Sequence, residues 1–151
     1  MKIISHRGNI KGPIPDKENR PSYIDCAIQL GYDVEVDIRF IDGEFWLGHD
    51  IPQYKIEQPW MVLRKDKLWY HCKDLQSALK MAELKIFKFF CHTEDSYVIT
   101  STGHLWVHDL NEDINHTCII PLLDLHSIIY NKNLNPFAVC TDYVYELKIK
   151  I

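Results

Sequence analysis

The sequence predicts an α/β fold, a compact TIM-barrel-like (β/α)8 arrangement with shortened or missing helices. Short apolar segments alternate with segments of helical pattern along the chain, which is typical of βαβ units and a parallel sheet. Several apolar segments end in a cluster of polar residues, and such barrels build their sites at the carboxyl ends of the strands. The chain has 151 residues, whereas roughly 200 or more are usual for such barrels. Several connections must therefore be loops or hairpins rather than full helices.

The first βαβ unit follows from a strand, a helix and a second strand. Residues 2–5 are mostly apolar and are expected to form the first strand. The helix begins near Pro21, which suits a first turn, with Asn19 as its expected N-cap. Gly31 ends the helix. Residues 32–39 alternate apolar and charged side chains, which predicts a strand. This order of elements indicates two parallel strands.

The rest of the chain is interpreted as short strands with a few helices and loops between them. One domain spanning residues 1–151 is the expected organisation. Helices are expected near 60–65, over 75–84 with Asp74 as N-cap and with Leu75, Leu79 and Ala82 on the apolar face, and over 122–130. Strands are expected at 45–47, 68–73, 86–91, 117–120 and 137–140, a hairpin at 97–100 and 104–107, and loop at 52–59.

The composition disfavours several classes of protein. The chain is 46% hydrophobic and 12% aromatic, so it can bury a core, and its net charge of −4 argues against binding nucleic acid by phosphate neutralisation. No apolar run approaches the ~20 residues that span a bilayer, and the N-terminus lacks the pattern of a signal peptide. Five cysteines without a Cys-x-x-Cys pair indicate small buried side chains in a reducing cytoplasm. A cytoplasmic location is therefore expected.

The second strand carries an unusual acidic face. Glu35 and Asp37 are two residues apart, so both carboxylates lie on one side of the strand, opposite Val34, Val36 and Ile38. A His-Asp pair follows within 15 residues. Paired carboxylates with a nearby histidine predict a site for a cation and a phosphate.

Five short motifs follow one another along the first 50 residues: His6-Arg7-Gly8, Glu18-Asn19, Glu35-x-Asp37, Asp42-Gly43 and His49-Asp50. In both order and spacing they resemble the first third of the glycerophosphodiester phosphodiesterases. Beyond residue 50, Lys73 resembles a lysine that the family carries after a Glu-x-Lys strand, and residues 140–143 resemble the threonine-aspartate of its final strand. The resemblance implies a barrel fold and a metal-dependent phosphodiesterase.

The resemblance implies roles for two histidines and two positively charged side chains. His6 and His49 match the two catalytic histidines of the family, so one is expected to act as base and the other as acid. Arg7 matches a phosphate-binding arginine, and Lys73 matches a lysine that helps to hold the phosphate. Imidazoles suit proton transfer near neutral pH, and fixed cations screen the charge of a phosphodiester.

The metal site implied by the resemblance departs from the family at one position. Glu35 and Asp37 match two metal-binding carboxylates, and the expected cofactor is a divalent metal, Mg²⁺ or Ca²⁺. The family usually has a third carboxylate two residues before the lysine, where this chain has His71. Either His71 is a nitrogen ligand, or Glu94 or Asp95 substitutes, or the metal is held weakly. A solvated strand end is an equally good interpretation of these last three residues.

The expected function is cleavage of a glycerophosphodiester-type, lipid or glycan phosphodiester by two-histidine acid–base catalysis. The resemblance suggests attack by a neighbouring hydroxyl, which gives a cyclic phosphate. One alternative is a non-catalytic module that binds a phosphate ligand on the same barrel, and another is phosphoryl transfer in surface-polysaccharide assembly. The expected partner is a small-molecule phosphodiester, with no nucleic acid and no transmembrane segment. A homodimer is also expected, because reduced helices leave apolar strand faces uncovered.

Overall fold

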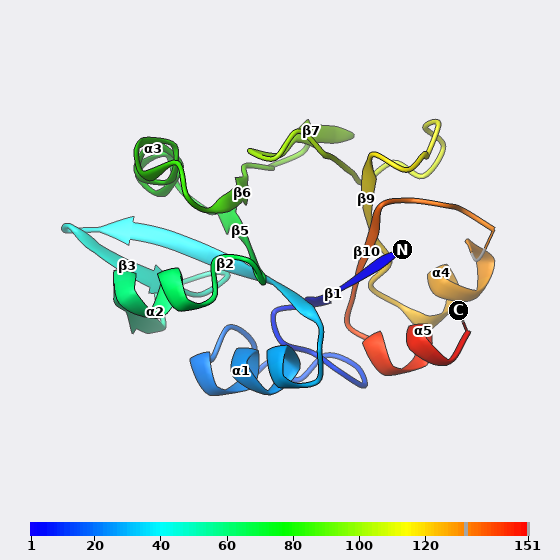
Figure 1. Ribbon diagram of the computed structural model, residues 1–151, viewed down its shortest axis with the longest axis horizontal. Coiled ribbons are helices and arrows are strands. Elements are labelled where there is room, and N and C mark those ends of the chain that lie inside the picture. Colours follow the sequence, from blue (N-terminus) through cyan, green and yellow to red (C-terminus); the bar gives the residue numbers. More distant parts are fainter. Residues whose placement is uncertain (132, 151) are drawn as a thin grey trace.

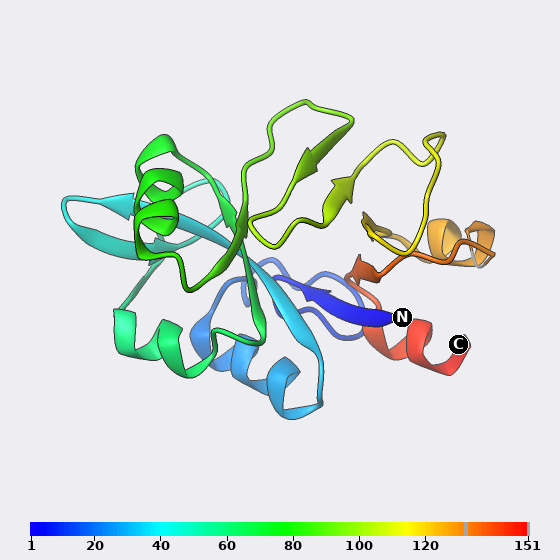
Figure 2. The ribbon, with the colours of Figure 1, turned by 45° about the horizontal axis from the view of Figure 1, so that its top comes forward.

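The computed structural model of the protein describes residues 1–131 and 133–150. In this part of the chain ten strands form one curled sheet, with helices on its outside (Figure 1, Figure 2). The strands are β1 (Lys2–His6), β2 (Asp33–Ile41), β3 (Glu44–Leu47), β4 (Tyr54–Ile56), β5 (Leu68–Cys72), β6 (Lys88–Phe90), β7 (Tyr97–Ile99), β8 (Leu105–Val107), β9 (Cys118–Pro121) and β10 (Ala138–Thr141).

The predicted parallel sheet is present. Within the described residues, seven strands are parallel neighbours in the order β6, β5, β2, β1, β10, β9 and β8. The last strand pairs with the first, so that Ile4 lies opposite Cys140 and Ser5 opposite Thr141. The β3–β4 hairpin extends β2 in antiparallel fashion, and β7 is antiparallel to β8. The carboxyl ends of distant segments therefore meet at one end of the sheet.

The expectation of a (β/α)8 barrel needs correction, because the sheet curls like a barrel without closing. Among residues 1–131 and 133–150, β6 pairs only with β5. The gap toward the β7–β8 hairpin is bridged by Ser101, whose amide donates to the carbonyl of Phe89 over 2.8 Å. Both strands that border the gap, β6 and β7, have three residues. Strands this short, joined by a loop rather than a helix, leave the last ladder unformed.

The helices are short, and they are missing from some crossovers, as the chain length predicts. No helix of the described residues is long and apolar enough to cross a membrane. The connections from β6 to β8 and from β8 to β9 contain no helix within the described residues. The helices are α1 (Pro21–Gln29), α2 (Gln58–Leu63), α3 (Leu75–Leu84), α4 (Leu125–Tyr130) and α5 (Val144–Lys150).

Two elements were not expected from the sequence, and the helix expected over 122–130 is shorter, Leu125–Tyr130. Residues 52–59 were expected as loop, but Tyr54–Ile56 form β4 because Ile56 pairs with Phe45 and is buried. The prolines at both ends of this segment hide such a short strand from a pattern search. The second is α5, whose Val144 and Leu147 are buried against the sheet.

The interior of the curled sheet is layered along its axis. Its middle layer is apolar and aromatic and includes Ile4, Trp69, Phe90, Trp106 and Ile119. Side chains alternate along a strand, so His6 and His71, two positions beyond Ile4 on β1 and Trp69 on β5, face the same interior at its carboxyl end. Glu35 and Asp37 on β2 face it beside them. The polar side chains at that end therefore rest on a packed floor.

The amino end of the sheet holds a buried carboxylate. Asp33 lies within 3.0 Å of the Lys2 Nζ, 3.3 Å of the Lys67 Nζ and 3.5 Å of the Lys88 Nζ. It also accepts a hydrogen bond from the Trp69 indole over 3.1 Å. A buried charge needs such compensation. The charge of this carboxylate is thereby compensated by neighbouring side chains, which distinguishes the amino end of the sheet from the carboxyl end.

Candidate active site

The turn after β1 has a backbone that glycine makes possible. Arg7 and Gly8 both have positive φ, +54° and +92°. A Cβ on Gly8 would approach Tyr23 Cδ1 within 2.8 Å, so a side chain there would meet the α1 helix. Backbone in this sparsely populated region persists only where the surroundings impose it, and it clusters at functional sites. The turn brings the Arg7 side chain toward β2.

The acidic face of β2 lies in the interior of the sheet. Glu35 is 2% exposed and Asp37 is 0% exposed, while Val34, Val36 and Ile38 pack in the core on the other face. This is the division between faces that the alternation predicts. Two buried carboxylates so close together need cations, protons or hydrogen-bond donors around them.

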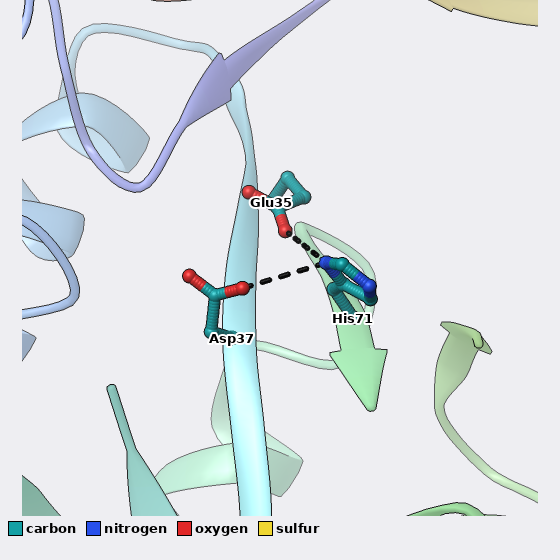
Figure 3. A group of neighbouring side chains, drawn as sticks. All are labelled: Glu35, Asp37 and His71. Carbon is teal, nitrogen blue, oxygen red and sulfur yellow. Dashed lines mark ion pairs between the residues drawn. The ribbon is translucent and has the colours of Figure 1, made fainter. Parts of the chain in front are cut away.

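His71 on β5 completes a group of three potential metal ligands. One donor atom each from Glu35, Asp37 and His71 lies within 4.8 Å of the others. The Nδ1 of His71 is 3.7 Å from Glu35 Oε1 and 3.4 Å from Asp37 Oδ1, and Figure 3 shows the three side chains pointing toward one another from the two strands. The register explains this, since Asp37 pairs directly with His71.

The donor atoms of this group fit a divalent cation. Glu35 Oε2 and Asp37 Oδ1 are buried and have no hydrogen-bond partner within the described residues. The Nε2 of His71 lies 3.2 Å from the carbonyl of His92, and because a carbonyl only accepts, Nε2 carries a proton. In the neutral ring Nδ1 then presents its lone pair to the two carboxylates. A second hydrogen bond of this kind is what orients metal-binding histidines.

Arg7 and Asn19 hold Asp37 from its other side. The Arg7 Nε lies 2.9 Å from Asp37 Oδ2, and its Nη1 lies 3.1 Å from Glu18 Oε2. The Asn19 side chain donates to Asp37 Oδ2 over 2.9 Å and accepts from the Asp37 amide. Burial raises the pKa of Asp37, but the close approach of His71, the charge of Arg7 and the hydrogen bond from Asn19 outweigh it and hold the pKa well below its usual range. Asp37 is therefore anionic near neutral pH.

The interaction of Asn19 with Asp37 changes one expectation. Asn19 was expected to cap α1, but the N-cap is Arg20, which makes no side-chain capping bond. Pro21 stands in the first turn as predicted. Asn19 has a left-handed backbone with φ +60° and is 1% exposed. It serves the site rather than the helix.

His6 is held by an aspartate from the far end of the chain. Its Nδ1 lies 2.8 Å from Asp142 Oδ1, which also accepts from Asn9 over 2.7 Å. Its Nε2 lies 3.8 Å from Glu35 Oε2. Burial lowers the pKa of His6, but the bond to Asp142 and the charge of Glu35 outweigh it, so the pKa lies above its ordinary value. Burial and the neighbouring charge of Asp37 likewise raise the pKa of Glu35.

Asn9 is a site residue that the sequence did not single out, whereas Asp142 was expected only as part of the final-strand motif, with no contact to His6. The barrel-like fold was a further signal for Asp142, because the last strand of a barrel lies beside the first. Asp142 follows β10, which pairs with β1. The residue that follows the last strand therefore lies beside His6.

His49 and Lys73 lie at the rim of the site. The His49 side chain is 42% exposed, and its Nδ1 lies 2.7 Å from Asp50 Oδ1. The Lys73 Nζ lies 3.9 Å from Asp37 Oδ1. Both residues line a cavity of about 520 Å³ together with His71. His49 thus shares a cavity with one of the three potential metal ligands.

His6 opens into a different cavity, of about 420 Å³, which His71 also lines. The polar residues that line it include His6, Arg7 and Glu35. The apolar and aromatic residues that line it are Phe90, Trp106, Leu110, Pro121 and Leu123. The structure therefore brings His6, Arg7, Glu35, Asp37, His71 and Lys73 together and leaves His49 at the edge.

Glu94 and Asp95 lie outside the group of three. Both are exposed in the segment between β6 and β7. Among the described residues the only group of at least three acidic, histidine or cysteine side chains close enough to hold an ion is Glu35, Asp37 and His71. Of the three alternatives for the missing carboxylate, the geometry favours His71 as a nitrogen ligand.

Comparisons with known proteins identify a fold. No protein-family profile and no curated protein matches the chain. Among solved structures the chain is similar to the crystal structure of glycerophosphodiester phosphodiesterase from Agrobacterium tumefaciens str. C58, with a TM-score of 0.63 and 14% sequence identity. The match covers 99% of this chain and 98% of that chain. At this identity the likeness demonstrates a shared fold, of the barrel-like kind that the sequence predicts.

Proposed function

We propose that the protein is a metal-dependent phosphodiesterase that acts on a small diester of the glycerophosphodiester type. The observation that carries the proposal is the buried pair of carboxylates, Glu35 and Asp37. Each has one oxygen without a hydrogen-bond partner among the described residues, and a nitrogen of His71 lies close to both carboxylates. The activity named for the structurally similar protein supports it. A cation bound by these donors would also explain why two carboxylates lie buried beside each other.

Glu35, Asp37 and His71 would hold the cation. When bound, a divalent cation screens the charge of the phosphodiester as the transition state forms. Arg7 contacts one Asp37 oxygen and Lys73 approaches the other. Both side chains thus stand where a phosphate oxygen would be received, and their charges add to that screening.

His6 is suited to move a proton. The bond to Asp142 requires a proton on Nδ1, because an ionised carboxylate only accepts. Nε2 is then free to take the proton of an attacking hydroxyl, or to return one to the leaving oxygen. In the proposed reaction a neighbouring substrate hydroxyl loses its proton, its oxygen bonds to phosphorus, and the leaving alkoxide is protonated as its bond to phosphorus breaks. His6 and His49 divide these two transfers.

Hydrolysis of a chromogenic phosphodiester tests the proposal. We expect metal-free protein to be inactive and Mg²⁺, Ca²⁺ or Mn²⁺, added in turn, to restore turnover. Glu35→Gln and His6→Ala should each lower kcat by roughly 10²-fold or more, since each removes a group used in the reaction. Glu83→Gln is the matched control, because Glu83 is exposed on α3. Circular dichroism of each variant separates loss of chemistry from loss of fold.

A non-catalytic phosphate-binding module is a second candidate, and one observation favours it. His71 Nδ1 is at ion-pair distance from both carboxylates, so a protonated His71 would itself fill the role of the cation. No turnover with any of the three metals, together with retained binding of a phosphodiester, would favour this module over the enzyme. Turnover that persists in Glu35→Gln would contradict both the cation site and the proposed mechanism.

A further inference from the structure

Two cysteines lie beside the proposed site, at the ends of neighbouring strands. β5 and β6 are parallel neighbours, and their register pairs His71 with Phe90. Cys72 is the last residue of β5, and Cys91 is the first residue after β6, so each lies one residue beyond that pair. Continuing the register by one residue sets the two on the same side of the sheet, about 4.8 Å apart. That separation lies within the Cα distances that a disulfide spans.

The two cysteines line the same cavity and differ in exposure. Cys72 is buried and Cys91 is exposed. Both line the cavity of about 520 Å³ that His49, His71 and Lys73 also line. An accessible thiol next to a buried partner is the arrangement of a reactive cysteine with its resolving cysteine.

We propose that Cys72 and Cys91 are a redox-active pair that a peroxide oxidises to a disulfide. The exposed Cys91 sulfur, as thiolate, attacks a peroxide oxygen, which breaks the O–O bond and gives a sulfenic acid and hydroxide or an alkoxide. The Cys72 sulfur then attacks the sulfenic sulfur, the S–S bond forms, and water leaves. The sulfurs lose two electrons in all, and the peroxide gains them. A dithiol reductant reverses the reaction.

The disulfide would act on the site through its neighbours. Cys72 lies between His71 and Lys73 in the sequence, and Cys91 precedes His92, whose carbonyl orients the His71 ring. Joining the two strand ends restrains the His71–His92 contact. This consequence, unlike disulfide formation, rests on the proposed function. We expect Mn²⁺ to bind the oxidised protein roughly tenfold more weakly, as with other changes around a metal ligand.

Peptide mapping by mass spectrometry tests the pair directly. The full chain is treated with hydrogen peroxide, its remaining thiols are alkylated, and it is digested without reductant. We expect a Cys72–Cys91 cross-linked peptide that dithiothreitol removes, and an alkylated Cys26. Cys26 is the internal control, because it is exposed without forming this pair. Cys91→Ser changes an exposed position and should abolish the cross-link while leaving the fold intact.

Two outcomes overturn the proposal: Cys91 stays alkylatable while Cys26 is oxidised, or Cys91 proceeds to sulfinic acid equally fast in wild type and Cys72→Ser. Because the readout is a covalent mass, it does not depend on phosphodiesterase activity. Mn²⁺ titration of reduced and oxidised protein forms a separate arm. A cross-link without an effect on Mn²⁺ would keep the redox pair and refute its coupling to the site.

Discussion

His71 is the residue on which the chemistry of the site turns. It stands where the resemblance leads one to expect a carboxylate, and the structure places its Nδ1 within 3.4 Å of Asp37 Oδ1. Two carboxylates and one imidazole form a mixed donor set. Transition-metal dications accept an imidazole nitrogen, whereas the hard cations Mg²⁺ and Ca²⁺ take oxygen ligands. The site should therefore prefer Mn²⁺ to Mg²⁺ and Ca²⁺.

Replacing His71 by a carboxylate tests this preference. In His71→Glu we expect Mg²⁺ and Ca²⁺ to bind more tightly and the advantage of Mn²⁺ to fall by roughly tenfold, because the donor set becomes all oxygen. Calorimetric titration of each metal measures the change. His116→Glu, at an exposed position, adds the same charge away from the site and should leave the preference unaltered. A preference that is the same in wild type and His71→Glu would show that His71 is not a ligand.

At the scale of elements, β2 and α3 illustrate what local sequence determines. Alternation along β2 was enough to predict that Glu35 and Asp37 share a face. For α3 the pattern predicted the bounds 75–84, which the structure has, but the wrong face. Leu75 and Leu79 are 69% and 56% exposed, and the buried residues are Ser77 and Met81. A helix of this length is oriented by the strand ends to which it is joined, so tertiary context overrides its apolar pattern.

The N-cap of α3 gives a prediction at this scale. Asp74 accepts from the Ser77 amide over 2.7 Å, as the sequence predicts for this cap. Asp74→Ala should lower the free energy of unfolding by about 1 kcal/mol, because the amide loses its partner. Chemical denaturation measures the difference. Asp74→Ser keeps an accepting oxygen and should lose only a small part of this; equal losses in both variants would refute a capping role.

At the scale of the whole molecule, the contacts that sequence reasoning missed are the ones that join distant segments. The His6–Asp142 bond links residues 136 apart in the sequence. It exists because β10 returns to pair with β1. The residues of the site that lie within one strand or turn, such as Arg7, Glu35 and Asp37, could be predicted. Asp142 and the incomplete closure of the sheet depend on how all the strands curl together, which no local pattern records.

The contact that spans the gap beside β6 gives a further prediction. The Ser101 hydroxyl accepts from the Phe89 amide over 2.9 Å and donates to the Phe87 carbonyl over 3.2 Å. Ser101→Ala removes both bonds, so we expect a loss of about 1 kcal/mol and faster hydrogen exchange at the Phe89 amide. The exposed Ser96 supplies the control variant Ser96→Ala. Unchanged exchange at Phe89 would mean that Ser101 does not hold the open edge.

The central claim is that the acidic face of β2 and His71 form a cation site. Anomalous diffraction from crystals soaked in Mn²⁺ and phosphate tests it most directly. We expect a manganese peak bonded to Glu35, Asp37 and His71, with phosphate between the metal and Arg7 and no such peak in crystals of Glu35→Gln. A fully soaked crystal with no peak at these three residues, and with His71 still at ion-pair distance from both carboxylates, would contradict it.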